Sequence, residues 1–424
     1  MGAGKSTEEK NEASILRRPE QGEASALYWA CRNGDIDTVQ KLTASIPYAD
    51  INCLEPNGST ALHAASFFGH ANVVRLLLHQ YGVMRHRRNR HGLTAYEEAD
   101  TDEIHLLFHR SPNSRRFCGD VATDDRYLFT WSIDKQTEDK DDNDEAPSDW
   151  LQELNKETMT RYNQVAANIG KTMATSSIIR SLIPRIMHCM DQPGLAYNES
   201  KAATDVQRLI NEHVTPANSE YQKACELVSK YVRTKKVEHL LRLHSLETPF
   251  YKVRGKDGVD HCFRLLLFYK LDTLYKRAYQ GRSFRGLTMT HSDLRTYQWA
   301  LKHKGSIVIT DNFCSTSVDK NAARGSVDTS SPDTIHVLMV FTFPEKCDTA
   351  IQLFRLSDTL PSISDFDDER EVLILPMTSF RIINIDTGKT SGQHTIYLEN
   401  VPTEGGLFAL LKVIWKYRGE TFEQ

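Results

Sequence analysis

Hydrophobic positions follow two helical stretches and then a series of strands along this chain. Apolar and small residues recur at helical spacing near the N-terminus and again between Trp150 and about Leu243, where Val206, Leu209 and Ile210 share one face. From about residue 253 the apolar residues gather in short β-rich runs. These runs cover residues 306–310, 334–343, 372–375, 380–385 and 395–398. Helices followed by strands favour an α+β fold over a doubly wound α/β sheet.

An internal repeat of small and apolar residues lies near the N-terminus. Its first copy holds Ala26 and Gly34, which recur about 35 positions later as Ala61 and Gly69. The second copy carries the pattern T-x-L-H-x-A, and a shortened third copy follows it. In period and pattern this stretch, roughly residues 24–110, resembles ankyrin repeats. The resemblance implies stacked pairs of antiparallel helices that bind a protein partner and catalyse nothing.

A basic run separates the second and third repeats, where ankyrin arrays carry a finger loop. It reads Arg85-His86-Arg87-Arg88 and continues to His91. Charge runs usually form solvated surface, so the sequence favours a solvated loop. Contact with an acidic protein partner is the alternative interpretation.

Composition excludes several classes of function. The chain has 424 residues, 40% hydrophobic and 25% charged, which is typical of two or three globular domains. A net charge of −4 does not favour nucleic-acid binding. No apolar run reaches the roughly 18 residues that span a membrane, and the polar N-terminus has no secretory signal. The 8 cysteines lack CxxC or Cys/His spacing, which predicts free thiols in a cytoplasmic protein and no metal site.

Three short polar motifs follow one another in the C-terminal half, each near an expected strand. They are Arg285-Gly286, Ser315-Thr316-Ser317 and Glu369-x-Glu371. Alone each motif is common, and a Glu-x-Glu on a strand usually places two charges on the solvent face. In this order they resemble the R-S-E class of arginine-specific mono-ADP-ribosyltransferases over residues 222–402. The resemblance implies a split β-sheet with flanking helices, NAD⁺ as co-substrate and no metal.

The family's mechanism gives the first two motifs their expected roles at the cofactor. The resemblance assigns Arg285 to the NAD⁺ phosphates, because a planar guanidinium binds phosphate oxygens in pairs. Gly286 would permit close approach of the backbone to the ligand. Ser315 is expected to hold the nicotinamide-side ribose and the catalytic glutamate, and Thr316 and Ser317 belong to the same cofactor-binding strand.

The two glutamates have separate expected roles. By family position Glu371 binds the ribose and stabilises the positive charge that develops as nicotinamide leaves. Glu369, expected on the same side of an extended chain, would act as base for an arginine acceptor. Phe366 matches the aromatic of the acceptor-recognition turn, although a loop aromatic packed into the core fits equally well. Arg324 is a further phosphate-binding candidate, with a solvated loop arginine as the alternative.

These patterns divide the chain into successive segments. We expect a disordered tail (1–22), ankyrin repeats (23–110), a cap with an acidic linker (111–149), a helical connector (150–221), the transferase domain (222–402) and a C-terminal segment (403–424). The tail begins Met1-Gly2 and has Ser6 at the position required for N-myristoylation of Gly2. A single acyl chain would give reversible membrane association, although short patterns of this kind also arise by chance.

The sequence therefore predicts an ankyrin module joined to an enzyme that transfers ADP-ribose from NAD⁺ to arginine side chains of protein acceptors. An NAD⁺ glycohydrolase, in which water replaces the acceptor, is the alternative enzyme. A transferase-like scaffold without activity is the alternative from another class. The presence of Arg285, Ser315, Glu369 and Glu371 together favours an active site.

Overall fold

The computed structural model describes residues 24–110, 116–119, 129–133, 199–248, 263, 266–267, 270–302, 306–310, 312–323, 334–376, 378–387 and 394–401. The chain divides into two compact units. Unit 1 comprises Met1–Pro112, Ala203–Val259 and Ser362–Phe366, and unit 2 comprises Asn113–Ala202, Asp260–Pro361 and Asp367–Gln424. The short segment Ser362–Phe366 thus belongs to the unit that contains the N-terminal repeats.

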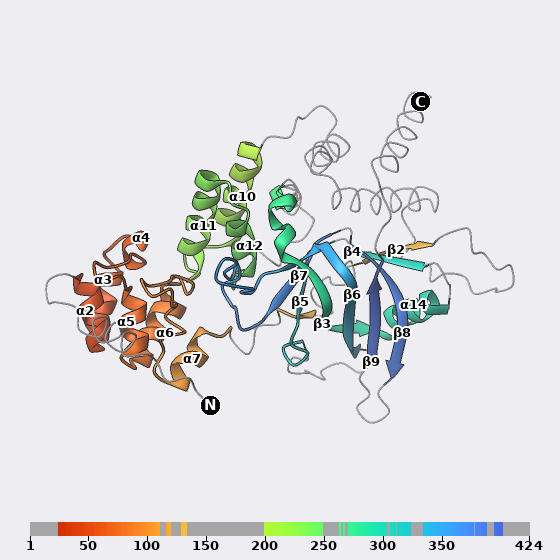
Figure 1. Cartoon of the computed structure of the whole chain (residues 1–424), viewed down its shortest axis with the longest axis horizontal. Coiled ribbons are helices and arrows are strands. Elements are labelled where there is room, and N and C mark those ends of the chain that lie inside the picture. The colour runs from red at the N-terminus through yellow and green to blue at the C-terminus, as the bar shows by residue number, and fades with distance from the viewer. Residues whose placement is uncertain are drawn as a thin grey trace. The chain divides into compact units, whose positions relative to one another are not determined.

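Unit 1 begins with short helices, drawn in red and orange in Figure 1. They are α2 (Ala26–Asn33), α3 (Ile36–Thr43), α4 (Tyr48–Ile51), α5 (Ala61–Phe67), α6 (Ala71–Arg75), the π-helical η1 (Leu76–Gln80) and α7 (Asp102–Phe108). Ser25, Thr60 and Thr101 begin α2, α5 and α7 by accepting a backbone hydrogen bond in the first turn. α2 packs on α3 and α5, and α6 packs on α5 and α7. These are the stacked helix pairs that the repeat predicts.

Two residues of the repeat pattern show why it recurs. Gly34 ends α2 with φ 72°, and a Cβ there would lie 2.6 Å from the Nδ1 atom of His70. In the second repeat, Nδ1 of His63 lies 2.7 Å from the Thr60 hydroxyl, and Nε2 lies 3.0 Å from the Leu93 carbonyl of the third repeat. Burial lowers the pKa of His63 to about 4. The histidine therefore joins neighbouring repeats as a neutral side chain.

Three further helices follow, α10 (Glu199–His213), α11 (Tyr221–Thr234) and α12 (Glu238–Ser245), and they belong to unit 1 from Ala203 onward. Val206, Leu209 and Ile210 of α10 are buried, which confirms the apolar face predicted for them. α11 and α12 pack against each other.

Unit 2 is built on a sheet that has nine strands among the described residues. They are β1 (Cys118–Gly119), β2 (Phe129–Ile133), β3 (Ala278–Thr290), β4 (Ser306–Thr310), β5 (Cys314–Ser317), β6 (Thr334–Gln352), β7 (Glu371–Ile374), β8 (Ser379–Thr387) and β9 (His394–Asn400). Their order is β1-β3-β5-β7-β6-β9-β8-β4-β2, with a further pairing of β3 and β6. β6 pairs with β3 and β9 over its first part and with β7 at its end, so it joins the two halves of the sheet.

One face of the sheet is covered by α14 (His291–Lys302), which contacts β3, β4 and β8 (Figure 1). Leu294, Tyr297 and Ala300 of α14 share a core cluster with Phe341 and Phe380 of the strands. The short 3₁₀ helix η6 (Leu271–Arg277) leads directly into β3. The fold is therefore α+β, as predicted: helical repeats followed by a sheet-rich part.

The five runs predicted as strands fall on β4, β6, β7, β8 and β9, and four of them differ from the strand by at most two residues at either end. The run 334–343 is shorter than β6, which continues to Gln352. The domain boundaries differ more. Residues 111–149, expected as cap and linker, contain β1 and β2, which pair with β3 and β4. The first part of the expected transferase domain, together with Ser362–Phe366, lies in unit 1. The first difference arises from strand pairing between residues far apart in the sequence. The second arises from ion pairs and hydrogen bonds that hold Ser362–Phe366 to α11 and α12.

The predicted tail and C-terminal segment, and most of the helical connector, lie outside the described residues. Within the described part of the chain, no helix combines the length and the apolar character needed to cross a membrane. The cysteines located there, at positions 31, 53, 118, 225, 314 and 347, form no disulfide.

Candidate active site

Three neighbouring strands of unit 2 bring the predicted motifs together. β3 pairs with β5 at Phe284 and Ser317, and β5 pairs with β7 so that Ser317 is opposite Glu371. Arg285 and Ser315 lie on the same two strands, next to this register. Motifs separated by long loops in the sequence therefore occupy adjacent strands at one place in the sheet.

Arg285 is buried on β3 and binds two backbone oxygens. Its Nη1 atom donates to the carbonyl oxygen of Ser315 at 2.8 Å and to that of Arg116 at 3.1 Å. A guanidinium offers five donors in one plane, a geometry suited to phosphate oxygens as well. The phosphate-binding role of Arg285 stays a prediction.

The Ser-Thr-Ser motif of β5 fastens the strand to its neighbour. The hydroxyl of Thr316 donates to the carbonyl oxygen of Val372 at 2.7 Å, and that of Ser317 donates to the carbonyl oxygen of Glu369 at 2.6 Å. Ser315 contacts Arg285 through its backbone carbonyl. The roles of these hydroxyls toward NAD⁺ stay predictions, whereas their role in holding β7 and the turn before it is visible.

Glu371 is the first residue of β7, and its side chain is fully buried. Its Oε1 atom accepts a hydrogen bond at 2.8 Å from Nη2 of Arg116, whose side chain is also buried. Its Oε2 atom is buried and accepts no hydrogen bond from the residues that the structure describes. A buried carboxylate oxygen without a donor is costly, so the site is suited to a ligand hydroxyl.

The position of Glu369 differs from the prediction. Residues 368–369 form a turn, and Arg370 has a left-handed φ of 46° before the strand begins at Glu371. The backbone N–H of Arg370 donates to the carbonyl oxygen of Asp367 at 3.2 Å, which closes this turn. The alternation of an extended strand therefore does not apply, and Glu369 and Glu371 do not share a strand face. Glu369 is half-buried.

Gly286 is required by a close approach within the chain itself. A Cβ at this position would lie 2.3 Å from the carbonyl oxygen of Ala323 and 3.3 Å from Sγ of Cys118. The Gly286 backbone N–H donates to the carbonyl oxygen of Phe117 at 2.8 Å. The chain segments that approach Gly286 are those of residues 117–118 and of Ala323, and the role of Gly286 toward a ligand stays a prediction.

Phe366, the expected acceptor-recognition aromatic, lies in unit 1 with 1% of its surface exposed. The guanidinium carbons of Arg85 and Arg110 lie 4.8 and 3.9 Å from the centre of its ring. These contacts are cation–π interactions in a desolvated setting. The structure thus shows the packed arrangement, and the role of Phe366 in acceptor recognition stays a prediction.

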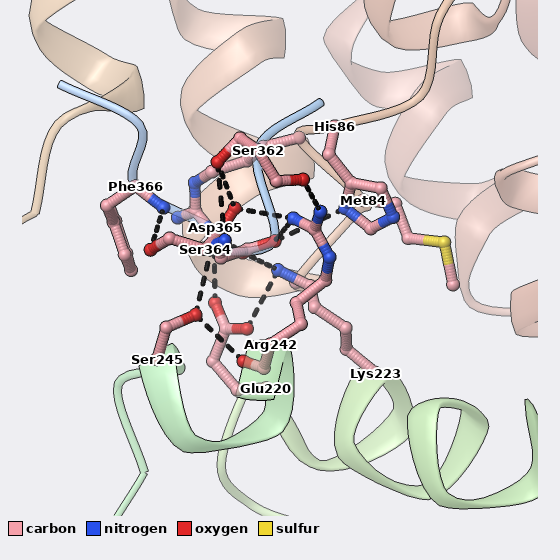
Figure 2. Close-up of polar contacts among 12 residues, drawn as sticks. Met84, His86, Glu220, Lys223, Arg242, Ser245, Ser362, Ser364, Asp365 and Phe366 are labelled. Carbon is pink, nitrogen blue, oxygen red and sulfur yellow. Dashed lines mark hydrogen bonds and ion pairs between the residues drawn. The ribbon is translucent and has the colours of Figure 1, made fainter. Parts of the chain in front are cut away.

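A buried group of charges surrounds the neighbouring Asp365 (Figure 2). Its carboxylate lies 2.8 Å from Nζ of Lys223 and 3.0 Å from Nη1 of Arg85. Glu220 lies 2.8 Å from the same Lys223 and 3.2 Å from the same Arg85. Burial alone would raise the pKa of Asp365, but Lys223, His86 and Arg85 outweigh it and hold that pKa well below its usual value.

The backbone around Asp365 is held as firmly as its side chain (Figure 2). Arg242 of α12 donates to the carbonyl oxygens of Ser362 and Ser364. The Ser245 hydroxyl, at the end of α12, accepts a hydrogen bond from the backbone N–H of Asp365 at 2.9 Å. The segment Ser362–Phe366 is therefore fixed in unit 1, three residues before Glu369 in the sequence.

The prediction of a solvated basic loop at residues 85–91 is wrong for its first residue. Arg85 is 5% exposed, because Glu220 and Asp365 supply the acidic partners from within the same unit. Sequence reasoning also missed Asp365 and Arg116. Asp365 directly precedes Phe366 in the sequence. Arg116 begins the run Arg-Phe-Cys-Gly, which has neither helical nor strand periodicity. Gly2 and Arg324 lie outside the described residues.

Comparison with known proteins identifies the repeats. Residues 11–99 match the family model for ankyrin repeats, in three copies. The N-terminal module is an ankyrin-repeat array. Over 71 residues, which are 17% of this chain, it is 37% identical to Inversin of Danio rerio, and the match spans 7% of the length of Inversin.

Solved structures of bacterial proteins are similar to part of this chain. The type III effector XopAI of Xanthomonas axonopodis pv. citri matches with 16% identity over 54% of this chain and 99% of its own, at a TM-score of 0.35. The ADP-ribosyltransferase HopU1 of Pseudomonas syringae matches with 12% identity over 48% of this chain and 99% of its own, at 0.30. The Vis toxin of Vibrio splendidus, an ADP-ribosyltransferase, matches with 18% identity over 51% and 90%, at 0.25.

Proposed function

We propose that this chain is an NAD⁺-dependent mono-ADP-ribosyltransferase that modifies arginine side chains of protein acceptors. The observation that carries the proposal is the buried carboxylate of Glu371, with one oxygen lacking a donor among the described residues. Its strand pairs with the strand of Ser315, which in turn pairs with the strand of Arg285. Buried carboxylate oxygens without a hydrogen-bond donor are rare in proteins, and a ligand-binding or catalytic role is a common reason for them. The order of these residues in the sequence is that of the R-S-E class.

In the proposed reaction these side chains bind the co-substrate and stabilise charge. Arg285 would hold the diphosphate of NAD⁺, and Glu371 would accept a hydrogen bond from a ribose hydroxyl. As the glycosidic bond breaks, its electron pair leaves with nicotinamide and positive charge develops on the ribose. A carboxylate that is already in place and shielded from water stabilises that charge strongly, because no solvent has to reorganise.

The acceptor requires a separate group. An arginine guanidinium is protonated in water, so one nitrogen must lose a proton as it bonds to the anomeric carbon. Glu369 is half-buried in the turn before Glu371, and Ser317 holds its backbone carbonyl. We assign Glu369 as the group that takes the proton. The ankyrin array would bind the protein partner, and acylation of Gly2 would place the enzyme at a membrane surface within the cytoplasm.

The test measures nicotinamide release and agmatine labelling in parallel with labelled NAD⁺ at saturating concentration. The full chain should do both. Glu371→Gln should lower nicotinamide release about 10²–10³-fold, the effect of losing one preorganised electrostatic contact. Glu345→Gln, which changes an exposed carboxylate of β6, serves as the matched control and should retain full activity.

The alternative functions give different results in the same assay. Nicotinamide release without labelling of agmatine would identify an NAD⁺ glycohydrolase. Folded protein that neither releases nicotinamide nor binds NAD⁺ by calorimetry would identify an inactive scaffold and overturn the proposal.

A further inference from the structure

A short segment of this chain lies across the candidate active site. Arg116–Gly119, which we call the strap, runs beside β3, with β1 pairing in parallel at Gly286 and Leu287. The Gly286 backbone N–H donates to the carbonyl oxygen of Phe117 at 2.8 Å. The strap therefore covers the backbone next to Arg285, the residue proposed to bind phosphate.

Arg116 contacts both ends of the proposed cofactor site. Its carbonyl oxygen accepts a hydrogen bond from Nη1 of Arg285 at 3.1 Å, and its guanidinium donates to Oε1 of Glu371 at 2.8 Å. In the proposed reaction, NAD⁺ would place a phosphate oxygen at Arg285 and a developing positive charge at Glu371. Arg116 supplies both from within the chain.

Both contacts of Arg116 are buried within the chain, so NAD⁺ would have to displace them in order to bind in the same place. The side chains of Arg116 and Glu371 are 2% and 0% exposed, and Phe117 is 4% exposed. The Sγ atom of Cys118 lies 3.5 Å from the carbonyl oxygen of Ala323 and fills the space beside Gly286. While the strap stays in place, the Arg116 carbonyl oxygen occupies Nη1 of Arg285 and the Arg116 guanidinium occupies Oε1 of Glu371.

We propose that the strap is a built-in competitive inhibitor of this site, and the proposal rests on the function proposed above. The strap must leave before NAD⁺ binds, so the apparent affinity for NAD⁺ is lowered by the fraction of molecules in which the strap is open. The strap can open because the attraction between Arg116 and Glu371 is largely offset by the free-energy cost of removing both charges from water. The net contribution of such a buried ion pair to stability is therefore small.

The experiment uses the full chain with Arg116→Ala, Phe117→Ala and, as matched control, Arg282→Ala, which removes an exposed arginine of β3. Phe117→Ala loosens the strap without leaving Glu371 unpaired, and thermal unfolding checks that each variant is folded. If the strap is open in a tenth or fewer of the wild-type molecules, the KM for NAD⁺ should fall about tenfold or more in both strap variants. The value of kcat should change little, and Arg282→Ala should match the wild type.

Hydrogen exchange at the Gly286 amide gives a readout that needs no activity. Both strap variants should exchange faster there without NAD⁺, and NAD⁺ should accelerate the same exchange in the wild type by displacing the Phe117 carbonyl. An unchanged KM in folded strap variants of an active enzyme would overturn the proposal. Faster exchange in both variants, with no NAD⁺ binding to either by calorimetry, would instead overturn the proposed function and the inhibition with it.

Discussion

The Nζ atom of Lys223 lies 2.8 Å from Oδ2 of Asp365, and neither side chain is exposed to solvent. The two residues come from α11 and from the segment that precedes Glu369. Arg85 from the ankyrin repeats joins the same carboxylate. One buried aspartate thus ties repeats, helices and the segment Ser362–Phe366 into unit 1.

We expect Asp365→Ala to destabilise unit 1 by about 3–5 kcal/mol, because Lys223 and Arg85 would stay buried without half of their negative partners. The urea midpoint of the full chain, followed by circular dichroism, measures this change. Asp358→Ala is the control. The Asp358 side chain is 92% exposed, and its ion pair with Arg355 should contribute little to the free energy of unfolding. Equal effects of the two substitutions would show that the buried charges around Asp365 do not stabilise the unit.

Stability should fall as the pH is lowered, through His63. Its folded pKa of about 4 lies below the usual value of 6.5, so only the unfolded chain binds a proton there between these values. The contribution of His63 is complete above pH 6.5 and is lost progressively down to pH 4, by at most about 3 kcal/mol. Urea midpoints from pH 4 to 7.5 measure the slope, and His63→Gln should reduce it. Part of the slope should remain, because burial also lowers the pKa of His86, to about 3. A slope that is unchanged in this variant would assign the pH dependence to other groups.

Much of the fold could be predicted because its signal is local. The T-x-L-H-x-A pattern specifies a capped helix and a bridging histidine within a few residues of Thr60, and apolar runs such as 306–310 form strands where predicted. β1 could not be predicted in this way. It is a two-residue strand whose only reason to be extended is its pairing with Gly286, more than a hundred positions away.

The site was predicted in part for the same reason. Arg285, Ser315 and Glu371 carry a motif order that the sequence displays, and the structure places them on adjacent strands. The placement of Glu369 depends on a turn with a left-handed Arg370, which alternation along a strand does not show. Arg116 meets Glu371 across 255 positions, and only tertiary pairing reveals such a contact.

The two glutamates should separate transfer from cleavage. Glu371 is proposed to stabilise charge on the ribose, so Glu371→Gln should suppress nicotinamide release with arginine or water as acceptor. Glu369 is proposed to act on the incoming guanidinium alone. Glu369→Gln should therefore lower agmatine labelling about 10²–10⁴-fold, the usual contribution of a positioned base, and leave water-driven NAD⁺ cleavage near the wild-type rate.

Asp368→Asn is the matched control, because Asp368 is an exposed carboxylate in the same turn as Glu369. It should retain both activities, provided that the turn itself is undisturbed. The measurement is agmatine labelling and nicotinamide release from the same reactions, with the Glu369 variant compared at saturating NAD⁺. Equal loss of both activities in Glu369→Gln would place Glu369 in the NAD⁺ site and end the division of roles. Loss of labelling alone is the result that the half-buried turn, held through the Ser317 hydroxyl, leads us to expect.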